Sequence, residues 1–200
     1  IPITTPDSII IDLTLTDALC YGSNDGTAEE VVTGGTAPLN IDWGVVDPNL
    51  LIAGNYNVLV TDINGCSSGI INYTINEPTQ LVIDSVNTTL VSCAPGNNGT
   101  ATIYSSGGIL PYSYSWSNGQ FFQTAQSLIS GTYMAYVFDE NGCLDTLEVL
   151  ISNAPQLDIV VNSTPISCNG QNDGELVANM VVGSYPLTYS WFHLSNPSVI

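Results

Sequence analysis

The strongest constraint on the fold is one short loop that occurs three times at a nearly constant interval. The loop is CYGSNDG from Cys20, CAPGNNG from Cys93 and CNGQNDG from Cys168. Self-similarity at a fixed period is typical of a tandem array of structural repeats. We expect repeats at residues 1–78, 79–155 and 156–200. A proline and then a tryptophan follow each cysteine at the same spacing; the prolines are Pro38, Pro111 and Pro186, and the tryptophans are Trp43, Trp116 and Trp191.

A second motif lies near the end of each complete repeat. AGNYNVLVTDINGC at 53–66 matches SGTYMAYVFDENGC at 130–143, and each copy ends in a second cysteine. Pro78 and Pro155 follow that cysteine at the same spacing in the two repeats. Almost no linker is left between the repeats, and proline stiffens the chain there. We therefore expect a semi-rigid array whose third repeat is truncated before its second motif.

The hydrophobic pattern within a repeat is that of β-strands. In PYSYSWS, aromatic residues alternate with serine, which is typical of a half-buried antiparallel strand. No stretch carries a sustained helical period, so we expect an all-β fold. A tryptophan on the third strand and a tyrosine just after a glycine are typical of an immunoglobulin-like sandwich. The aromatic residues expected in the core are Trp43, Tyr56, Trp116, Tyr133 and Trp191. In the first repeat we expect strands at 8–18, 27–33, 39–44, 56–62 and 69–76, with a short one before Gly54.

Composition excludes several classes of function. The chain has 18 Asp and Glu but no Lys or Arg, so it cannot neutralise phosphates. We expect no nucleic-acid binding, and its apolar runs are too short for membrane insertion. The single histidine, His193, occurs once in a threefold array, so no repeated active site depends on it. We expect no enzyme activity. No signal peptide is visible, and the chain is typical of an internal segment of a longer secreted protein.

Taken together, C-x-G-x-N-D-G, GG-x-x-P-Y-x-Y-x-W, G-x-Y and D-x-N-G-C resemble the SprB-type repeat of giant cell-surface adhesins of gliding Bacteroidota. The resemblance covers essentially the whole chain. It implies immunoglobulin-like (PKD-like) β-sandwiches in long arrays, export by the type IX secretion system and a place at the cell surface. It also implies a role in surface attachment or gliding. The chain departs from the family at Asn98, where aspartate is usual, and at Ala37 and Leu39 around Pro38.

Two cysteines per repeat in a secreted chain predict disulfides. Pairing within a repeat would join Cys20 to Cys66 and Cys93 to Cys143. In a seven-stranded sandwich these loops lie at opposite ends, about 17–20 Å apart, whereas a disulfide requires Cα atoms within about 7 Å. We slightly prefer pairing between repeats, Cys20 to Cys143. Cys66 would then pair with a repeat upstream of this chain, and Cys93 and Cys168 with repeats downstream of it. If the variable segment forms no strand, pairing within a repeat becomes possible, so both alternatives stay open.

The same head-to-tail geometry would bring Asp25 of one repeat towards Asp139 and Asn141 of the next. Oxygen ligands of this kind suit Ca²⁺, so these residues are weak calcium candidates and Ca²⁺ is the one cofactor considered. The alternative is structural, because Asn, Asp and Gly are ordinary turn residues.

Two kinds of glycosylation are also predicted. If the resemblance holds, the Asp-Ser and Asp-Thr tripeptides resemble O-glycosylation sites of Bacteroidota, with Ser8, Ser85 and Thr146 as acceptors. The Asn-x-Ser/Thr pattern marks four further candidates, which are Asn72, Asn87, Asn98 and Asn162.

Two functions of different classes follow. The first is a structural stalk in a large surface adhesin that holds a distal binding region away from the cell, with neighbouring repeats as its partners. The second is a binding module whose repeats themselves contact glycans or other surface proteins. A binding module would expose an aromatic residue in every repeat, whereas the alternation assigns the strand aromatics to the core.

Overall fold

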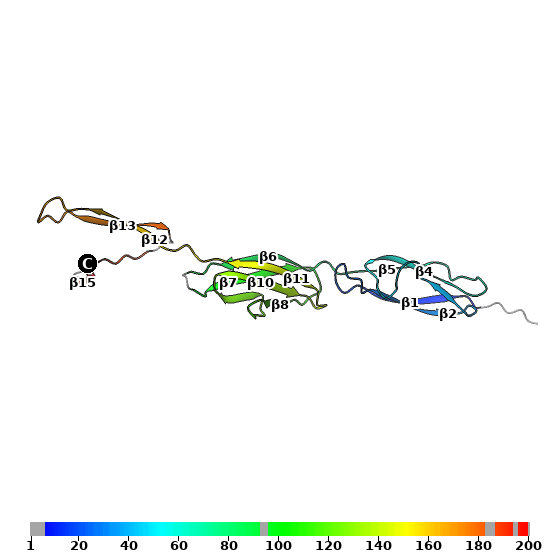
Figure 1. Ribbon diagram of the computed structural model, residues 1–200. Coiled ribbons are helices and arrows are strands. Elements are labelled where there is room, and N and C mark those ends of the chain that lie inside the picture. Colours follow the sequence, from blue (N-terminus) through cyan, green and yellow to red (C-terminus); the bar gives the residue numbers. More distant parts are fainter. Residues whose placement is uncertain (1–6, 93–95, 183–186, 194–195, 200) are drawn as a thin grey trace, which may run out of the picture. The chain divides into compact units, whose positions relative to one another are not determined.

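The computed structural model describes residues 7–92, 96–182, 187–193 and 196–199, and in these residues the chain forms strands and no helix (Figure 1). The all-β prediction is confirmed. In the first repeat the strands are β1 (Ile10–Thr16), β2 (Thr27–Thr33), β3 (Asn40–Asp42), β4 (Gly54–Thr61) and β5 (Ile71–Ile75). In the second repeat they are β6 (Val82–Thr89), β7 (Gly99–Ser106), β8 (Ser113–Trp116), β9 (Thr124–Leu128), β10 (Gly131–Phe138) and β11 (Leu144–Ile151). The third repeat contributes β12 (Asp158–Thr164), β13 (Glu175–Val182), β14 (Phe192–His193) and β15 (Asn196–Val199).

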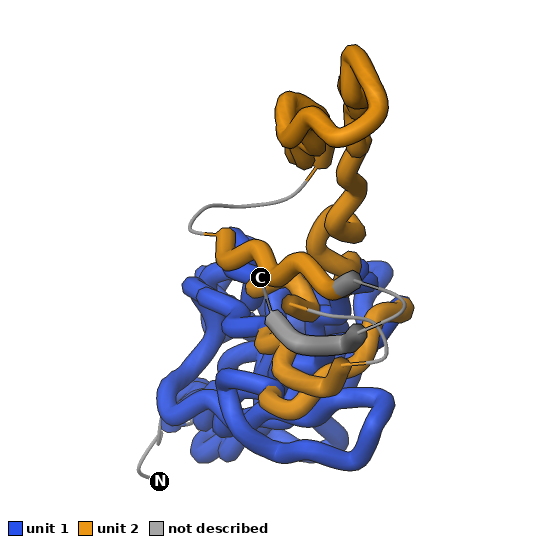
Figure 2. The backbone as a smooth tube through the Cα atoms, turned by 90° about the vertical axis from the view of Figure 1, so that its left-hand side faces the viewer, with its two compact units in different colours: residues 1–88, 101–125, 132–150 blue, residues 89–100, 126–131, 151–200 orange. Residues whose placement is uncertain are grey.

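Contacts between Cα atoms divide the chain into two compact units (Figure 2). Unit 1 comprises Ile1–Thr88, Ala101–Ala125 and Thr132–Leu150, and unit 2 comprises Thr89–Thr100, Gln126–Gly131 and Ile151–Ile200. All strands of the first repeat lie in unit 1, together with the loop between β10 and β11. The site considered below therefore lies within unit 1.

The complete repeats share one sheet arrangement. In the first repeat β1 pairs with β2, and β3, β4 and β5 form a second antiparallel sheet. In the second repeat the sheets have the orders β6-β7-β9 and β11-β10-β8. The strand expected before Gly54 is reduced to a single bridge between Gly26 and Leu51, whereas the second repeat forms β9 in its place. The segment from tryptophan to tyrosine is longer in the second repeat than in the first, so it has room for a strand.

The core of the first repeat lies between its two sheets. Ala28, Leu51 and Val58 are buried there, and Trp43 and Tyr56 pack against the same cluster. Burying these apolar side chains removes them from water, which is the main force that holds two sheets together.

Tyr73 of β5 is also buried in this core and contacts two aromatic rings. The Trp43 ring meets it edge-on with centroids 5.8 Å apart, and the Tyr56 ring stacks on it at 5.6 Å. The Tyr56 hydroxyl donates a hydrogen bond to the Ile52 carbonyl oxygen at 2.9 Å, which is the contact of a tyrosine corner. In the second repeat Trp116 is 2% exposed, and it is the most deeply buried of the five predicted core aromatics. The other four are half-buried and are Trp43, Tyr56, Tyr133 and Trp191.

A glycine pair follows the second strand of each complete repeat. At Gly107 φ is +76°, and an added Cβ would lie 1.8 Å from the carbonyl oxygen of Gln80. Gly34 occupies the same position in the first repeat, with φ at +78° and 2.0 Å to the Ser8 oxygen. A side chain is therefore excluded at both positions, and the chain can turn tightly towards the residues that contact the second-motif loop.

The third repeat shows an open apolar face. β12 pairs with β13, and every residue of β12 is exposed. A shallow groove is lined by apolar side chains that include Ile159, Val161, Leu187 and Trp191. The groove thus lies between alternating residues of β12 and the segment 187–191, which forms no strand. In the described part of the chain we find no helix with the length and hydrophobicity needed to cross a bilayer.

Candidate functional site

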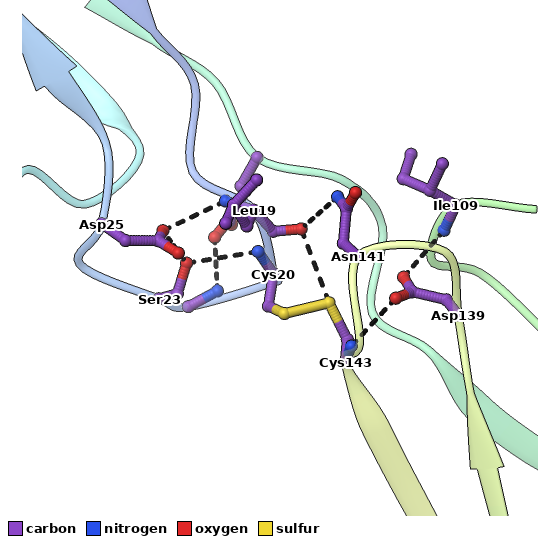
Figure 3. Close-up of a disulfide and its surroundings, with 10 residues drawn as sticks. Leu19, Cys20, Ser23, Asp25, Ile109, Asp139, Asn141 and Cys143 are labelled. Atoms are coloured by element: carbon purple, nitrogen blue, oxygen red, sulfur yellow. Dashed lines mark hydrogen bonds between the residues drawn. A yellow bond between two sulfur atoms is a disulfide. The ribbon is translucent and has the colours of Figure 1, made fainter.

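A disulfide joins Cys20 to Cys143 (Figure 3). Cys20 lies between β1 and β2, and Cys143 lies between β10 and β11, so the bond links the first repeat to the second. The two residues are 123 positions apart in sequence, and their Cα atoms are 5.7 Å apart. This is the pairing that the sequence slightly preferred. The Cys20–Cys66 and Cys93–Cys143 alternatives are wrong, because each would need a cysteine that is already bonded.

The remaining cysteines differ from this pair in exposure. Cys66 and Cys168 carry free thiols and are exposed, whereas Cys20 and Cys143 are half-buried. Cys93 lies outside the described residues. Formation of the disulfide therefore coincides with partial burial of both cysteines.

Pairing within the first repeat fails because its two cysteines lie at opposite ends of the sandwich. Cys20 precedes the start of β2, where Gly26 bridges to Leu51. Beyond the other end of β2, the Thr36 amide donates to the Asp62 carboxylate at 3.1 Å, close to Cys66. β2 has 7 residues, and at about 3.3 Å per residue its ends lie roughly 20 Å apart. That separation is far beyond the reach of a disulfide.

The loop around Cys20 is held by one side-chain oxygen. Oδ1 of Asp25 accepts a hydrogen bond from the Leu19 amide at 3.0 Å, and it also accepts one from the Ser23 hydroxyl. The first bond recurs in the other repeats, with donor and acceptor at the same positions. Ser92 donates its amide to Asn98 at 3.0 Å, and Ser167 donates its amide to Asp173 at 3.0 Å. An amide oxygen accepts this bond as a carboxylate oxygen does, which explains why Asn98 can replace the usual aspartate.

These hydrogen bonds also favour the charged form of the two aspartates. The Ser23 hydroxyl, with the Leu19 amide, lowers the pKa of Asp25 against the opposing effect of burial. The Ser167 hydroxyl and amide lower the pKa of Asp173 in the same way. Hydrogen bonds donated to a carboxylate stabilise its negative charge, so folding favours the ionised form of both aspartates.

The loop that ends at Cys143 needs two oxygens from one side chain. Asp139 accepts the Cys143 amide on Oδ1 at 2.9 Å and the Ile109 amide on Oδ2 at 2.9 Å. In the first repeat Asp62 likewise accepts the Cys66 amide on Oδ1 and the Thr36 amide on Oδ2. Asn offers one oxygen rather than two, so only a carboxylate can satisfy donors on both sides.

Both of these aspartates are only 5% exposed. Burial acts to raise the pKa of Asp62, but the amides of Cys66, Thr36 and Asn64 outweigh it, and the net shift of the pKa is downward. A buried carboxylate with several backbone donors is satisfied without a cation, which suits a chain that has no Lys or Arg.

Asn141 makes the direct polar contact across the two loops. Its side-chain nitrogen donates to the Leu19 carbonyl oxygen at 2.8 Å, and Cys143 Sγ lies 3.5 Å from the same oxygen. We call the disulfide together with loops 19–25 and 139–143 the joint. The sequence singled out Asn141 as a metal candidate and missed this contact. It also missed Ser23, which has no counterpart at Gly96 or Gln171 and so left no repeat signal.

The calcium candidates do not converge. Figure 3 shows Asp25 and Asp139 on opposite sides of the disulfide, each turned towards amides near its own loop. Asn141 turns its donor nitrogen, not its oxygen, across the joint. Among the described residues there is no group of three or more His, Cys, Asp or Glu side chains that could hold a metal ion. The arrangement therefore fits loop stabilisation better than cation binding.

All predicted glycosylation acceptors are exposed. Asn98 differs from the rest, because its side-chain nitrogen already donates to the Ser92 hydroxyl at 2.7 Å. A glycan on that nitrogen would compete with the loop contact. The exposed acceptors are Ser8, Ser85, Thr146, Asn72, Asn87, Asn98 and Asn162.

Comparison with known proteins agrees with the repeat pattern. A family model described as SprB repeat matches residues 13–44, 85–121 and 160–195, once in each repeat. Each match contains the first-cysteine loop and the glycine pair or its equivalent position. No curated protein matches the chain.

Proposed function

This chain belongs to the SprB repeat family, and we propose that it is a stalk segment of a cell-surface adhesin that holds a distal binding region away from the cell. SprB repeats are found in cell-surface adhesin-like proteins of Bacteroidota. The family is a structural repeat rather than an enzyme family. Gliding, and export through the type IX system, are part of this proposal.

The observation that carries the proposal is the disulfide from Cys20 to Cys143. A force applied between the ends of the chain passes through covalent bonds. The disulfide is a shorter covalent path than the backbone between its two cysteines. When the chain is stretched, the force therefore passes through the disulfide and not through the residues between the cysteines. Those residues include most of both complete repeats. A segment that keeps its length under tension is suited to a stalk.

Single-molecule stretching of the chain between its termini tests this function. The oxidised chain should release length only from residues outside 20–143. Cys20→Ser should add the bypassed length, which is about 400 Å for a separation of 123 residues at about 3.3–3.6 Å per residue. Cys66→Ser, which leaves the joint intact, should stretch like the parent chain. Equal extension of all three chains would contradict a load-bearing stalk.

A binding module is the second candidate, and one observation favours it. Phe121 and Phe122 lie in the loop after β8 and are 70% and 75% exposed. Exposed aromatic residues are common at binding surfaces. The matching segment of the first repeat, GVVDPNL at 44–50, contains no aromatic residue, so the feature is not repeated. A glycan array probed with the parent chain and with the Phe121→Ser, Phe122→Ser double variant separates the two functions. A binding module predicts a signal that the double variant loses, and a stalk predicts no signal from either chain.

A further inference from the structure

We propose that Cys66 and Cys168 are the two halves of the same kind of joint, so that Cys168 of one chain forms a disulfide with Cys66 of another. The proposed partner is therefore a second copy of this chain, joined head to tail. In a longer array the same surfaces would join successive repeats. This pairing rests on the geometry of the loops and does not depend on the stalk function.

The loop that ends at Cys66 is built as the loop that ends at Cys143. The Cys66 amide donates to Asp62 Oδ1 at 2.9 Å, and the Cys143 amide donates to Asp139 Oδ1 at 2.9 Å. A backbone hydrogen bond from the aspartate amide to the cysteine carbonyl closes each loop, at 2.9 Å and 3.1 Å respectively. The backbone that presents Cys143 to its partner is thus already present at Cys66. Asn64 precedes Cys66 in the same register as Asn141 precedes Cys143.

The loop that begins at Cys168 is built as the loop that begins at Cys20. The Ser167 amide donates to Asp173 at 3.0 Å, as the Leu19 amide donates to Asp25 at 3.0 Å. The Gln171 amide donates to the Cys168 carbonyl oxygen at 3.1 Å, as Ser23 donates to Cys20 at 3.1 Å. The Ser167 carbonyl therefore corresponds to the Leu19 carbonyl that accepts from Asn141.

The decisive observation is that these same motif positions are already disulfide-bonded once in this chain. The first cysteine of one repeat is bonded to the second cysteine of the next, and not to that of its own repeat. Cys66 is a second cysteine and Cys168 is a first cysteine, so the two are of complementary kinds. Both are exposed, whereas the bonded pair is half-buried. The joint partly buries Cys20 and Cys143, whereas the equivalent surfaces at Cys66 and Cys168 remain accessible.

The reaction needs an oxidant, which we take to be a low-molecular-weight disulfide such as oxidised glutathione. The Cys66 thiolate attacks it, forms a mixed disulfide and releases one glutathione thiolate. The Cys168 thiolate then attacks the Cys66 sulfur and releases the second. Two thiols lose two protons and two electrons, and the glutathione disulfide is reduced to two thiols.

This register would produce two interleaved covalent paths through an array. One path leaves the Cys20–Cys143 bond, follows the backbone from Cys143 to Cys168 and crosses the next disulfide. The other enters at Cys66 and follows the backbone into the second repeat. Each path skips the residues that the other path uses.

The test uses two variants of the whole chain, both carrying Cys93→Ser. The first also carries Cys168→Ser and keeps the Cys66 thiol, and the second carries Cys66→Ser and keeps the Cys168 thiol. Each is incubated alone and with the other in a glutathione redox buffer, and the products are separated on a non-reducing gel. We expect the mixture to give a Cys66–Cys168 heterodimer in about tenfold excess over either homodimer. Peptide mapping should identify the new bond.

A displaced thiol provides the matched control. In the first variant Cys66→Ser is combined with Ser67→Cys, which moves the exposed thiol to the next position. This chain should lose the preference for the Cys168 partner. At equal concentrations, unselective oxidation gives a heterodimer about twice as abundant as either homodimer. A heterodimer at or below that ratio, or a displaced thiol that pairs equally well, would overturn the proposal.

Discussion

The side-chain nitrogen of Asn141 donates a hydrogen bond to the carbonyl oxygen of Leu19 at 2.8 Å, across 122 positions of sequence. The bond lies beside the disulfide, so it orients the two loops in the position in which Cys20 and Cys143 meet. It belongs to a turn motif, D-x-N-G-C, that would otherwise be explained by local conformation alone. The asparagine therefore has a role in joining repeats as well as in forming a turn.

Asn141→Asp should weaken the joint. The substitution replaces a donor with a carboxylate that repels the Leu19 carbonyl oxygen, at a cost of about 1 kcal/mol. We expect the Cys20–Cys143 bond to be reduced several-fold more readily in a glutathione titration monitored by thiol labelling. Asn64→Asp in the first repeat is the matched control and should leave this titration unchanged. An unchanged titration for both variants would exclude a role for Asn141 in the joint.

Removing the disulfide should destabilise the complete repeats. Cys143→Ser opens a loop of 123 positions, and loss of a native disulfide typically lowers the free energy of unfolding by about 2–5 kcal/mol. Urea denaturation monitored by tryptophan fluorescence measures this, because Trp43 and Trp116 lie in the complete repeats. Cys66→Ser removes a free thiol and should leave the midpoint in place.

The two kinds of loop aspartate should respond differently to the same substitution. Asp139→Asn leaves one of two backbone amides without an acceptor, which should cost about 1–3 kcal/mol. Asp25→Asn keeps the one oxygen that the Leu19 amide needs, and it should change stability by less than about 0.5 kcal/mol. Thermal melts of the two variants and the parent chain measure and compare these losses of stability. Equal losses would show that charge, rather than the number of acceptor oxygens, holds these loops.

Stability should decline with acid below the ordinary aspartate pKa of 3.8, because folding lowers the pKa of Asp62. In that window the unfolded chain binds more protons than the folded chain, so protonation favours unfolding. The contribution is complete above 3.8 and is lost as pH falls through the folded pKa. The difference in unfolding free energy between the parent and Asp62→Asn should therefore shrink as pH falls from 5 to about 2. A constant difference would mean that the pKa of Asp62 is not lowered.

Chelation should leave the protein unchanged. The carboxylates of Asp25 and Asp139 already accept hydrogen bonds from amides near their own loops, so a calcium ion would have to displace those donors. We expect the same melting temperature in EDTA and in millimolar CaCl₂, measured at fixed ionic strength because a chain of net charge −18 responds to screening. A rise of several degrees in calcium, absent in magnesium, would support the calcium hypothesis instead.

The strands could be predicted from sequence because they depend on periodicity, whereas the pairing between repeats was only slightly preferred and was decided by the structure. Alternating side chains identify the strands, and the positions of the two cysteine loops relative to strand ends decide which loops can meet. The sequence also shows that the variable segment differs in length between the repeats, but it does not show whether that segment forms a strand. The longer segment of the second repeat allows β9 to form where the first repeat has only the Gly26–Leu51 bridge.

The chemistry of the loops could not be predicted in the same way. Asp, Asn and Gly serve both calcium loops and hydrogen-bonded turns, so residue type alone does not separate them. The distinction depends on whether backbone amides from distant segments point at the carboxylate. For Asp139 the deciding donor is Ile109, 30 positions away, brought there by the glycine pair that precedes it. For Asn141 the deciding feature is that its side-chain nitrogen, rather than its side-chain oxygen, faces Leu19.

The bond between Cys20 and Cys143 also changes the result of proteolytic cleavage between these two residues. Phe121 and Phe122 are exposed in the loop after β8, where a protease that cleaves after aromatic residues has access. Cleavage there opens the backbone between the two bonded cysteines, yet both fragments stay attached through sulfur. A chain cut once within this region would still run unbroken from end to end. Separation of the two fragments would require a reducing agent as well as a protease.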